Sequence, residues 1–164
     1  IRGIFGWMMI YLAVLTINLA WYGWSCIRNR ADHAKNRGLV NIALQAGLLI
    51  AAANCAYQGW IIGQPMMLGI SLVGFATVTT NLWFILNPKP GPVDWLFEHI
   101  KGIVGVGISV DTAFFAFGAV RFAPWLALNP ILWAVPLTVG LGLILYYRRQ
   151  IYAPLRRHSS APAG

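Results

Sequence analysis

Residues 39–86 read LVNIALQAGLLIAAANCAYQGWIIGQPMMLGISLVGFATVTTNLWFIL and contain no charged side chain. A membrane-spanning helix needs about 20 mostly apolar residues, and this stretch is long enough for two, at residues 39–62 and 66–86. Only a short interruption at Gln64 and Pro65 separates them. The sequence therefore predicts two helices joined by a tight antiparallel hairpin.

The rest of the chain has the same apolar character. Of its 164 residues, 59% are hydrophobic and 10% are charged, and a water-soluble domain of this length could not bury so much apolar surface. Three further stretches, residues 3–27, 100–122 and 130–147, also have the length and composition of a span. The sequence therefore predicts an all-α, polytopic membrane helix bundle of about five transmembrane helices.

Basic residues decide the expected orientation. Lys and Arg outnumber Asp and Glu by 12 to 4, which in a soluble domain would suggest nucleic acid as a partner. Nearly all of them instead lie beside the apolar stretches, within residues 28–37, 89–101 and 148–157. The positive-inside rule places these three segments in the cytoplasm. We therefore expect the bacterial inner membrane, an outer N-terminus, an inner C-terminus and no nucleic-acid partner.

The chain is expected to form one transmembrane domain, residues 1–152, followed by a basic, flexible cytoplasmic tail, residues 153–164. Its expected partners are the lipid bilayer and the anionic lipids of the cytoplasmic face. Other membrane subunits or a second copy of the chain are further candidates.

Asp111 is the most unusual residue of the predicted spans, because a carboxylate at mid-bilayer costs roughly 2.5–3.5 kcal/mol on insertion scales. No Lys or Arg occupies a mid-membrane position, and Arg121 lies about 15 Å further along the same helix. Asp111 is therefore expected either to be neutral and hydrogen-bonded, or to be charged and to face water, a proton path or a cation.

Several amides and hydroxyls, together with one histidine, are candidates for a shared ligand or proton site with Asp111. They are Asn18, Gln45, Asn54, Thr77 and Asn81, with His99 at the inner mouth of the fourth helix. The alternative interpretation is that these amides only hold neighbouring helices together.

The small residues of the fourth predicted helix fall on two opposite sides at 100° per residue. One side carries Gly102, Gly105, Ser109, Thr112 and Ala116, and the other carries Gly107, Asp111 and Gly118. Small residues let helices approach closely, so this pattern predicts a helix in the centre of the bundle with Asp111 pointing into protein.

The histidines suggest a possible metal site at the inner surface. His33 and His99 lie on the same predicted side, and imidazole and carboxylate groups together suit several metals. The carboxylates that would complete the site are Asp32, Asp94 and Glu98. The alternative is two interfacial histidines that bond to loop backbone or lipid headgroups. Because no P-loop, nucleophile elbow or haem-attachment motif occurs, no catalytic residue and no cofactor is assigned.

The fourth helix also carries a recognisable motif. His99, Gly105, Gly107 and Ile108, with residues 112–114, form the pattern H-x5-G-x-G-I-x3-T-A-F, and FAPW, WAVPLTVG and a basic YYRRQ follow it. In these segments the chain resembles a group of small, functionally uncharacterised multi-pass bacterial inner-membrane proteins. Members of that group tend to carry His or Tyr where this chain has Asp111, which implies a hydrogen-bonding or ligand group there.

These observations predict a non-enzymatic integral inner-membrane protein. Its polar pocket between Asp111 and His99 would bind a small ligand, a lipid, a quinone or a partner helix. Three alternatives stay open. The first is a proton- or cation-coupled transporter or channel that uses Asp111, and the second is an accessory or assembly subunit of a respiratory or photosynthetic membrane complex. The third is a redox protein with haem or metal at His33 and His99.

Overall fold

The computed structural model describes residues 2–123, 125 and 130–159, and all regular structure in this part of the chain is helical. The predicted all-α class is therefore confirmed. The long helices are α1 (Arg2–Arg28), α2 (Leu39–Ile62), α3 (Pro65–Leu86), α4 (Asp94–Ala113) and α6 (Pro130–Ser159). The short elements are the 3₁₀ helix η1 (His33–Arg37), the π-helical segment η2 (Phe114–Gly118) and α5 (Ala119–Phe122).

The predicted hairpin of α2 and α3 is confirmed, with bounds that agree within one residue. Gly63 ends α2 in the left-handed conformation, at a φ of 70°. The Gly63 and Gln64 amides donate to the carbonyls of Trp60 and Gly59, which caps the helix in the manner of a Schellman motif. Pro65 then starts α3, a position where its fixed φ and missing N–H cost nothing.

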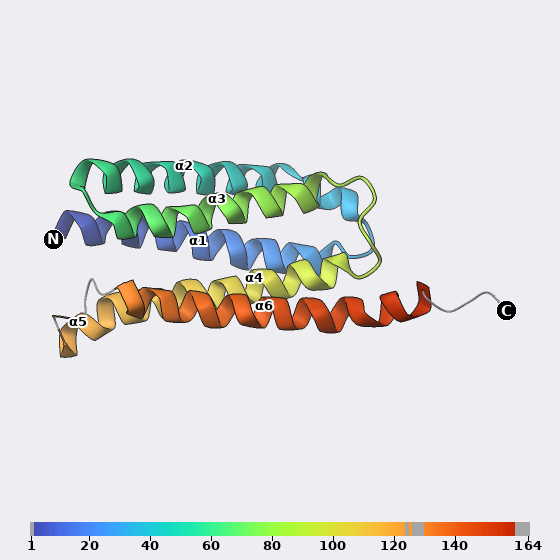
Figure 1. Cartoon of the computed structure of the whole chain (residues 1–164). Helices are drawn as coiled ribbons and strands as arrows, with labels where there is room; N and C mark the ends of the chain where they lie inside the picture. The colour runs from blue at the N-terminus through green and yellow to red at the C-terminus, as the bar shows by residue number, and fades with distance from the viewer. Residues whose placement is uncertain (1, 124, 126–129, 160–164) are drawn as a thin grey trace.

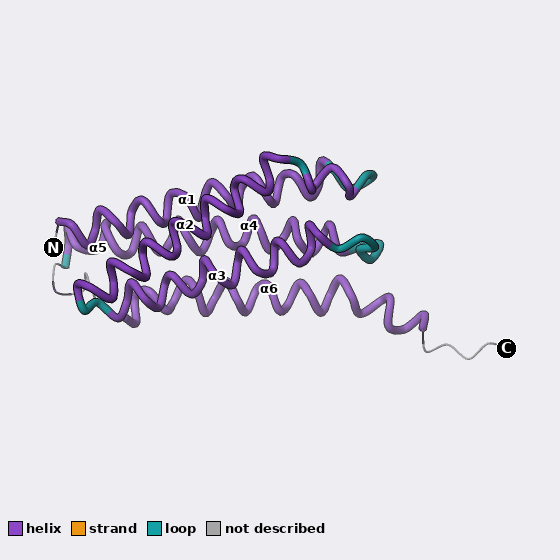
Figure 2. The backbone as a smooth tube through the Cα atoms, turned by 90° about the horizontal axis from the view of Figure 1, so that it is seen from above, coloured by secondary structure: helices purple, strands orange, loops and turns teal. Residues whose placement is uncertain are grey.

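The long helices lie side by side and run alternately in opposite directions (Figure 1). Helix α1 packs against α2 and α4, and α4 lies between α1 and α6. The connections at residues 29–38 and 87–93 lie at the same end of the bundle as the C-terminal part of α6, which extends beyond the other helices (Figure 2). The N-terminus and the α2–α3 turn lie at the opposite end.

The apolar core lies between the first three helices. Met8, Tyr11 and Leu15 of α1 meet Leu48 of α2 and Met67 of α3, all less than 5% exposed. Helices α1, from Phe5, α2 and α3 are each long and apolar enough to cross a membrane. This composition indicates a membrane protein.

Helix α4 differs from the expected span of residues 100–122 at both ends. It begins six residues earlier, at Asp94, whose Oδ2 accepts a hydrogen bond of 2.7 Å from the Gly91 amide just before the helix. It ends at Ala113, where the π-helical segment widens the next turn before α5. Helix α6 begins at Pro130 as predicted but continues to Ser159, so the expected tail is helical that far. Residues 160–164 of that tail lie outside the described residues.

One of the two small-residue sides of α4 forms the predicted close contact. A Cβ atom on Gly102 would lie 2.8 Å from the Cα atom of Gly23, and one on Gly105 would lie 2.9 Å from the side chain of Leu19. Both contacts are with α1. The missing side chains of Gly102 and Gly105 therefore allow α4 and α1 to pack backbone to backbone.

The prediction of a close helix contact on the opposite side of α4, at Gly107 and Gly118, is wrong. In the described part of the chain, no atom beyond Gly107's own stretch of helix lies within 4 Å of a Cβ built on it, and the three atoms nearest to a Cβ on Gly118 belong to the Phe114 ring of its own segment. Helix α6 instead packs on the side of α4 that carries Val104 and Ile108, against Gly140. In this second contact the large apolar side chains are on α4 and the glycine is on α6.

Candidate functional site

A hydrogen bond between two helices fixes the depth of α4 in the bundle. The Ser109 Oγ of α4 and the Thr16 Oγ1 of α1 lie 2.6 Å apart, and Ser109 also donates to the carbonyl of Leu12 at 3.3 Å. Thr16 lies near the middle of α1. Ser109 is therefore at mid-height of the bundle, and Asp111, two residues on, is displaced from it by only about 3 Å along the helix.

Asp111 is exposed on the outer face of α4, so the prediction that it points into protein is wrong. Its neighbours on this face are Gly107, Val110 and Phe114, the last two 51% and 67% exposed. Among the described residues, none forms a hydrogen bond or ion pair with the Asp111 carboxyl. The reason is geometric. Helix α1 covers one side of α4 and α6 covers a second side, and Asp111 lies on neither of these two sides.

Three of the predicted amides do gather, between α1, α2 and α3. Gln45 Nε2 donates to Asn18 Oδ1 at 3.4 Å, and Asn81 Nδ2 is 3.5 Å from the same oxygen and 3.4 Å from Gln45 Oε1. All three side chains are at most 2% exposed. The Asn18 Nδ2 and Asn81 Oδ1 atoms have no hydrogen-bond partner in the described part of the chain.

Asn54 and Thr77, the other two polar residues of the expected site, are half-buried. The carbonyl of Thr77 accepts a hydrogen bond from Thr80 within α3. With the amides buried and Asp111 exposed on α4, the predicted continuous polar path through Asp111 does not form.

A charged cluster that the sequence analysis missed lies between α1 and α4. Glu98 forms an ion pair with Lys101, three residues further along α4, and accepts a 2.5 Å hydrogen bond from the hydroxyl of Tyr22. Lys101 also donates to Thr80 Oγ1 of α3 at 3.3 Å. Glu98 is only 8% exposed, so the cluster links α1, α3 and α4 with charge-assisted hydrogen bonds. The i, i+3 spacing of Glu98 and Lys101 in the sequence could have predicted this ion pair.

The two histidines of the expected metal site have separate partners. His99 Nδ1 lies 2.8 Å from the carbonyl of Gly23, while His33 Nδ1 lies 3.4 Å from Asn36 Nδ2 and its ring meets Phe84 edge-on. No group of three or more His, Cys, Asp or Glu side chains in the described residues is placed to hold a metal ion. The expected cluster of His33 and His99 with Asp32, Asp94 and Glu98 therefore does not form.

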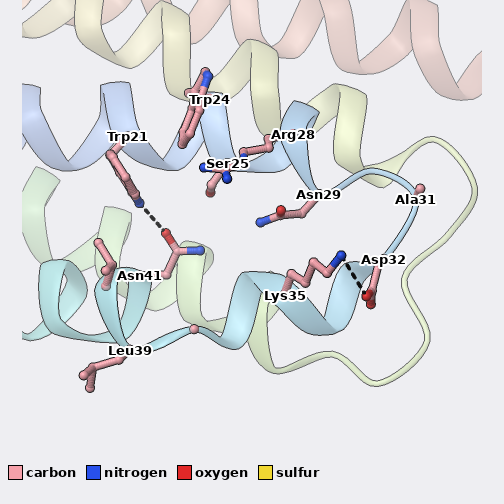
Figure 3. Close-up of a pocket in the computed structure, with 12 residues that line it drawn as sticks. Trp21, Trp24, Ser25, Arg28, Asn29, Ala31, Asp32, Lys35, Leu39 and Asn41 are labelled. Atoms are coloured by element: carbon pink, nitrogen blue, oxygen red, sulfur yellow. Dashed lines mark hydrogen bonds and ion pairs between the residues drawn. The ribbon is translucent and has the colours of Figure 1, made fainter.

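A cavity of about 460 Å³ opens between the end of α1, η1 and the start of α2 (Figure 3). A chain of side-chain hydrogen bonds holds its wall. Trp21 Nε1 donates to Asn41 Oδ1 at 2.9 Å, Asn41 donates to the carbonyl of Asn36 at 2.8 Å, and Asn29 donates to Asn36 Oδ1 at 2.9 Å. Trp24 lines the same cavity. This pocket was not predicted, because its walls come from residues far from Asp111.

No protein-family model, curated protein or solved structure matches the chain. The resemblance carried by the motif of the fourth helix therefore stays a prediction.

Proposed function

We propose that this chain is a five-span subunit of a bacterial inner-membrane complex, with an outer N-terminus and an inner C-terminus. In this proposal the exposed face of α4 around Asp111 binds a membrane helix of a different protein. That helix presents a basic or hydrogen-bond-donating side chain to the Asp111 carboxyl. The protein itself carries out no reaction.

Five spans are supported by the packing of α4 and α6 on the helices that are apolar enough to span. The Ser109–Thr16 and Gly102–Gly23 contacts hold α4 along α1, at the same depth. Gly140 of α6 meets α4 at Ile108, next to Ser109, and residues 130–147 contain no charged side chain.

The orientation is supported by the ends of the bundle. The basic residues of segments 28–37 and 89–101 and of the last turns of α6 lie toward one end, which the positive-inside rule assigns to the cytoplasm. Arg2 and Arg121 are the basic residues of the other end.

One observation supports the proposal of a partner helix: the Asp111 carboxyl group lies at mid-height of the bundle and is exposed. A charged side chain facing lipid at this depth costs roughly 2.5–3.5 kcal/mol or more. Thr16, Asn18 and Ser109, which lie near this level, each have a side-chain hydrogen bond inside the bundle. A partner helix that donates to Asp111 removes this cost.

A second copy of the chain is a poorer partner. Each of the 12 basic residues lies near one end of a predicted span, and Lys101, the most deeply placed, already pairs with Glu98. A second copy therefore offers no cation at the depth of Asp111. A transporter is also less well supported, because Asp111 is separated from the amides of Gln45 and Asn81.

The proposal is tested by purification from native membranes in a mild detergent, followed by native mass spectrometry. We expect wild type to form a heteromeric complex. Replacing Asp111→Leu should weaken the complex roughly 5- to 30-fold, since an interhelical hydrogen bond contributes about 1–2 kcal/mol in model peptides. Asp111→Asn, which keeps hydrogen-bonding capacity, should weaken it less. A wild-type protein that is recovered only as a monomer would overturn the proposal.

A further inference from the structure

The cavity between α1 and α2 has a mixed lining that suits an amphiphile. Its apolar lining consists of Trp21 and Trp24 of α1, with ring centroids 5.0 Å apart, and the exposed side chains of Leu39 and Val40 of α2. Tryptophan prefers the region between lipid headgroups and acyl chains. This apolar part of the lining is therefore suited to the upper part of an acyl chain and to the glycerol region.

Cations also line the cavity. Arg28 has its guanidinium 4.7 Å from the centre of the Trp24 ring, and Lys35 forms an exposed 3.6 Å ion pair with Asp32 (Figure 3). These are the charged residues that line the cavity, so its net charge is positive. An exposed ion pair of this kind contributes little to stability. Lys35 can therefore leave Asp32 and bind another anion at a small cost in free energy.

The neutral polar groups of the cavity are already engaged. Ser25 donates to the carbonyl of Tyr22, and Asn29 and Trp21 donate within the amide chain of the wall. The first turn of α2 begins at the cavity, and its N-cap, Gly38, provides no side-chain cap. Amide N–H groups in such a turn favour an anion and add to the two cations.

We propose that this cavity is a binding site for the phosphate headgroup of an anionic phospholipid of the inner leaflet. Arg28 and Lys35 contact the phosphate, and Trp21 and Trp24 flank the first part of the lipid chains. The pocket is preorganised, because the hydrogen bonds of Trp21, Asn41 and Asn36 hold its wall before the lipid arrives. The inference uses the membrane orientation proposed above but does not depend on Asp111.

The test uses the full chain, delipidated in detergent and mixed with equal amounts of phosphatidylglycerol and phosphatidylcholine. Native mass spectrometry then reports which lipid stays bound. We expect one phosphatidylglycerol per chain, and we expect Arg28→Gln combined with Lys35→Gln to weaken its binding roughly 30-fold, since each basic residue near an anionic lipid strengthens attraction severalfold. The matched control, Lys89→Gln with Arg149→Gln, removes two charges toward the same end but outside the pocket and should bind like wild type.

Two further arms make the result decisive. Arg28→Lys with Lys35→Arg keeps both charges and should retain most of the binding, which separates loss of charge from loss of fold. Asp111→Leu should bind the lipid normally, so failure here and failure of the partner proposal can be told apart. Equal binding of the two lipids, or unchanged binding in the double Gln variant, would overturn the inference. Displacement of the lipid by inorganic phosphate at millimolar concentration would also overturn it, by assigning the pocket to a free anion.

Discussion

Ser109 and Thr16 share a 2.6 Å hydrogen bond between α4 and α1, although 93 positions separate them in the chain. Through this contact the fourth helix is held at the depth of the first, which is apolar enough to cross a membrane. Asp111, two residues beyond Ser109, is thereby held at mid-height of the bundle while it faces outward. The proposed partner helix depends on both the depth and the exposure of Asp111.

The contact of α4 with α1 should tolerate no side chain at Gly102. An alanine Cβ there would lie 2.8 Å from the Cα atom and 3.0 Å from the nitrogen of Gly23, which are backbone atoms that cannot move aside cheaply. We expect Gly102→Ala to destabilise the protein by about 1–3 kcal/mol, measured by steric trapping in bicelles. Gly107→Ala is the matched control on the open face and should be neutral or stabilising by up to about 1 kcal/mol. Equal losses in both variants would contradict the packing described.

The ion pair of Glu98 and Lys101 should be important for stability because little water reaches it. The two side chains are 11% and 15% exposed, so Glu98→Gln leaves a mostly buried ammonium group without its anion. We expect a loss of about 3 kcal/mol, at the lower end of the range for buried pairs, in the same unfolding assay. Adding Lys101→Met to this variant should recover part of the loss. A double variant less stable than Glu98→Gln alone would show that the pair is not coupled.

The contact of α6 with the start of α4 should depend on pH in the alkaline range. The hydroxyl of Tyr152 donates to Asp94 at 2.5 Å, and burial, followed by this hydrogen bond, raises the pKa of Tyr152. Its stabilising contribution is therefore fully present below about pH 10, the ordinary pKa of tyrosine, and is lost as pH rises through the raised value.

Tyrosinate absorbance of wild type minus Tyr152→Phe reports this titration. We expect the difference curve to have its midpoint above pH 10. A midpoint at or below that value would mean that the Tyr152–Asp94 contact does not persist in the membrane-embedded protein.

The apolar pattern of the sequence was sufficient to predict the helical class and the α2–α3 hairpin. Residues 39–62 are mostly apolar and carry no charge, and Gly63 and Pro65 are the residues that end one helix and begin the next. The start of α4 was missed because charged residues lie within its first two turns, so the predicted apolar span began only at residue 100. Asp94 and Glu98 fell in the segment before that span, whereas Asp94 accepts a hydrogen bond from the Gly91 amide and Glu98 pairs with Lys101 in the helix.

Helical periodicity predicts which residues of α4 share a side, but it does not predict which side packs against a neighbouring helix. Gly102 and Gly107 look equivalent in the sequence, yet only Gly102 contacts another helix. The position of α6 was decided by Val104 and Ile108, which the small-residue pattern ignored. For this reason the sequence identified Asp111 as an unusual residue but wrongly predicted that its side chain points into protein, whereas it is exposed.

The gathering of Asn18, Gln45 and Asn81 was predicted in part, because amides at similar depth on neighbouring helices tend to meet. The lipid pocket could not be predicted in this way. Its wall is built by the hydrogen bonds of Trp21, Asn41 and Asn36, and their geometry depends on how η1 folds back toward α1.

Depth-matched photo-crosslinking in native membranes tests the central claim most directly. A photoreactive amino acid replaces Val110, beside Asp111, or Ile50, which is 70% exposed at the middle of α2. Only position 110 should give a discrete adduct with another polypeptide. The mass that this polypeptide adds should differ from that of a second copy of the protein, and Asp111→Leu should remove the adduct. Lipid adducts alone at both positions, or an adduct of two identical chains at position 110, would contradict the account.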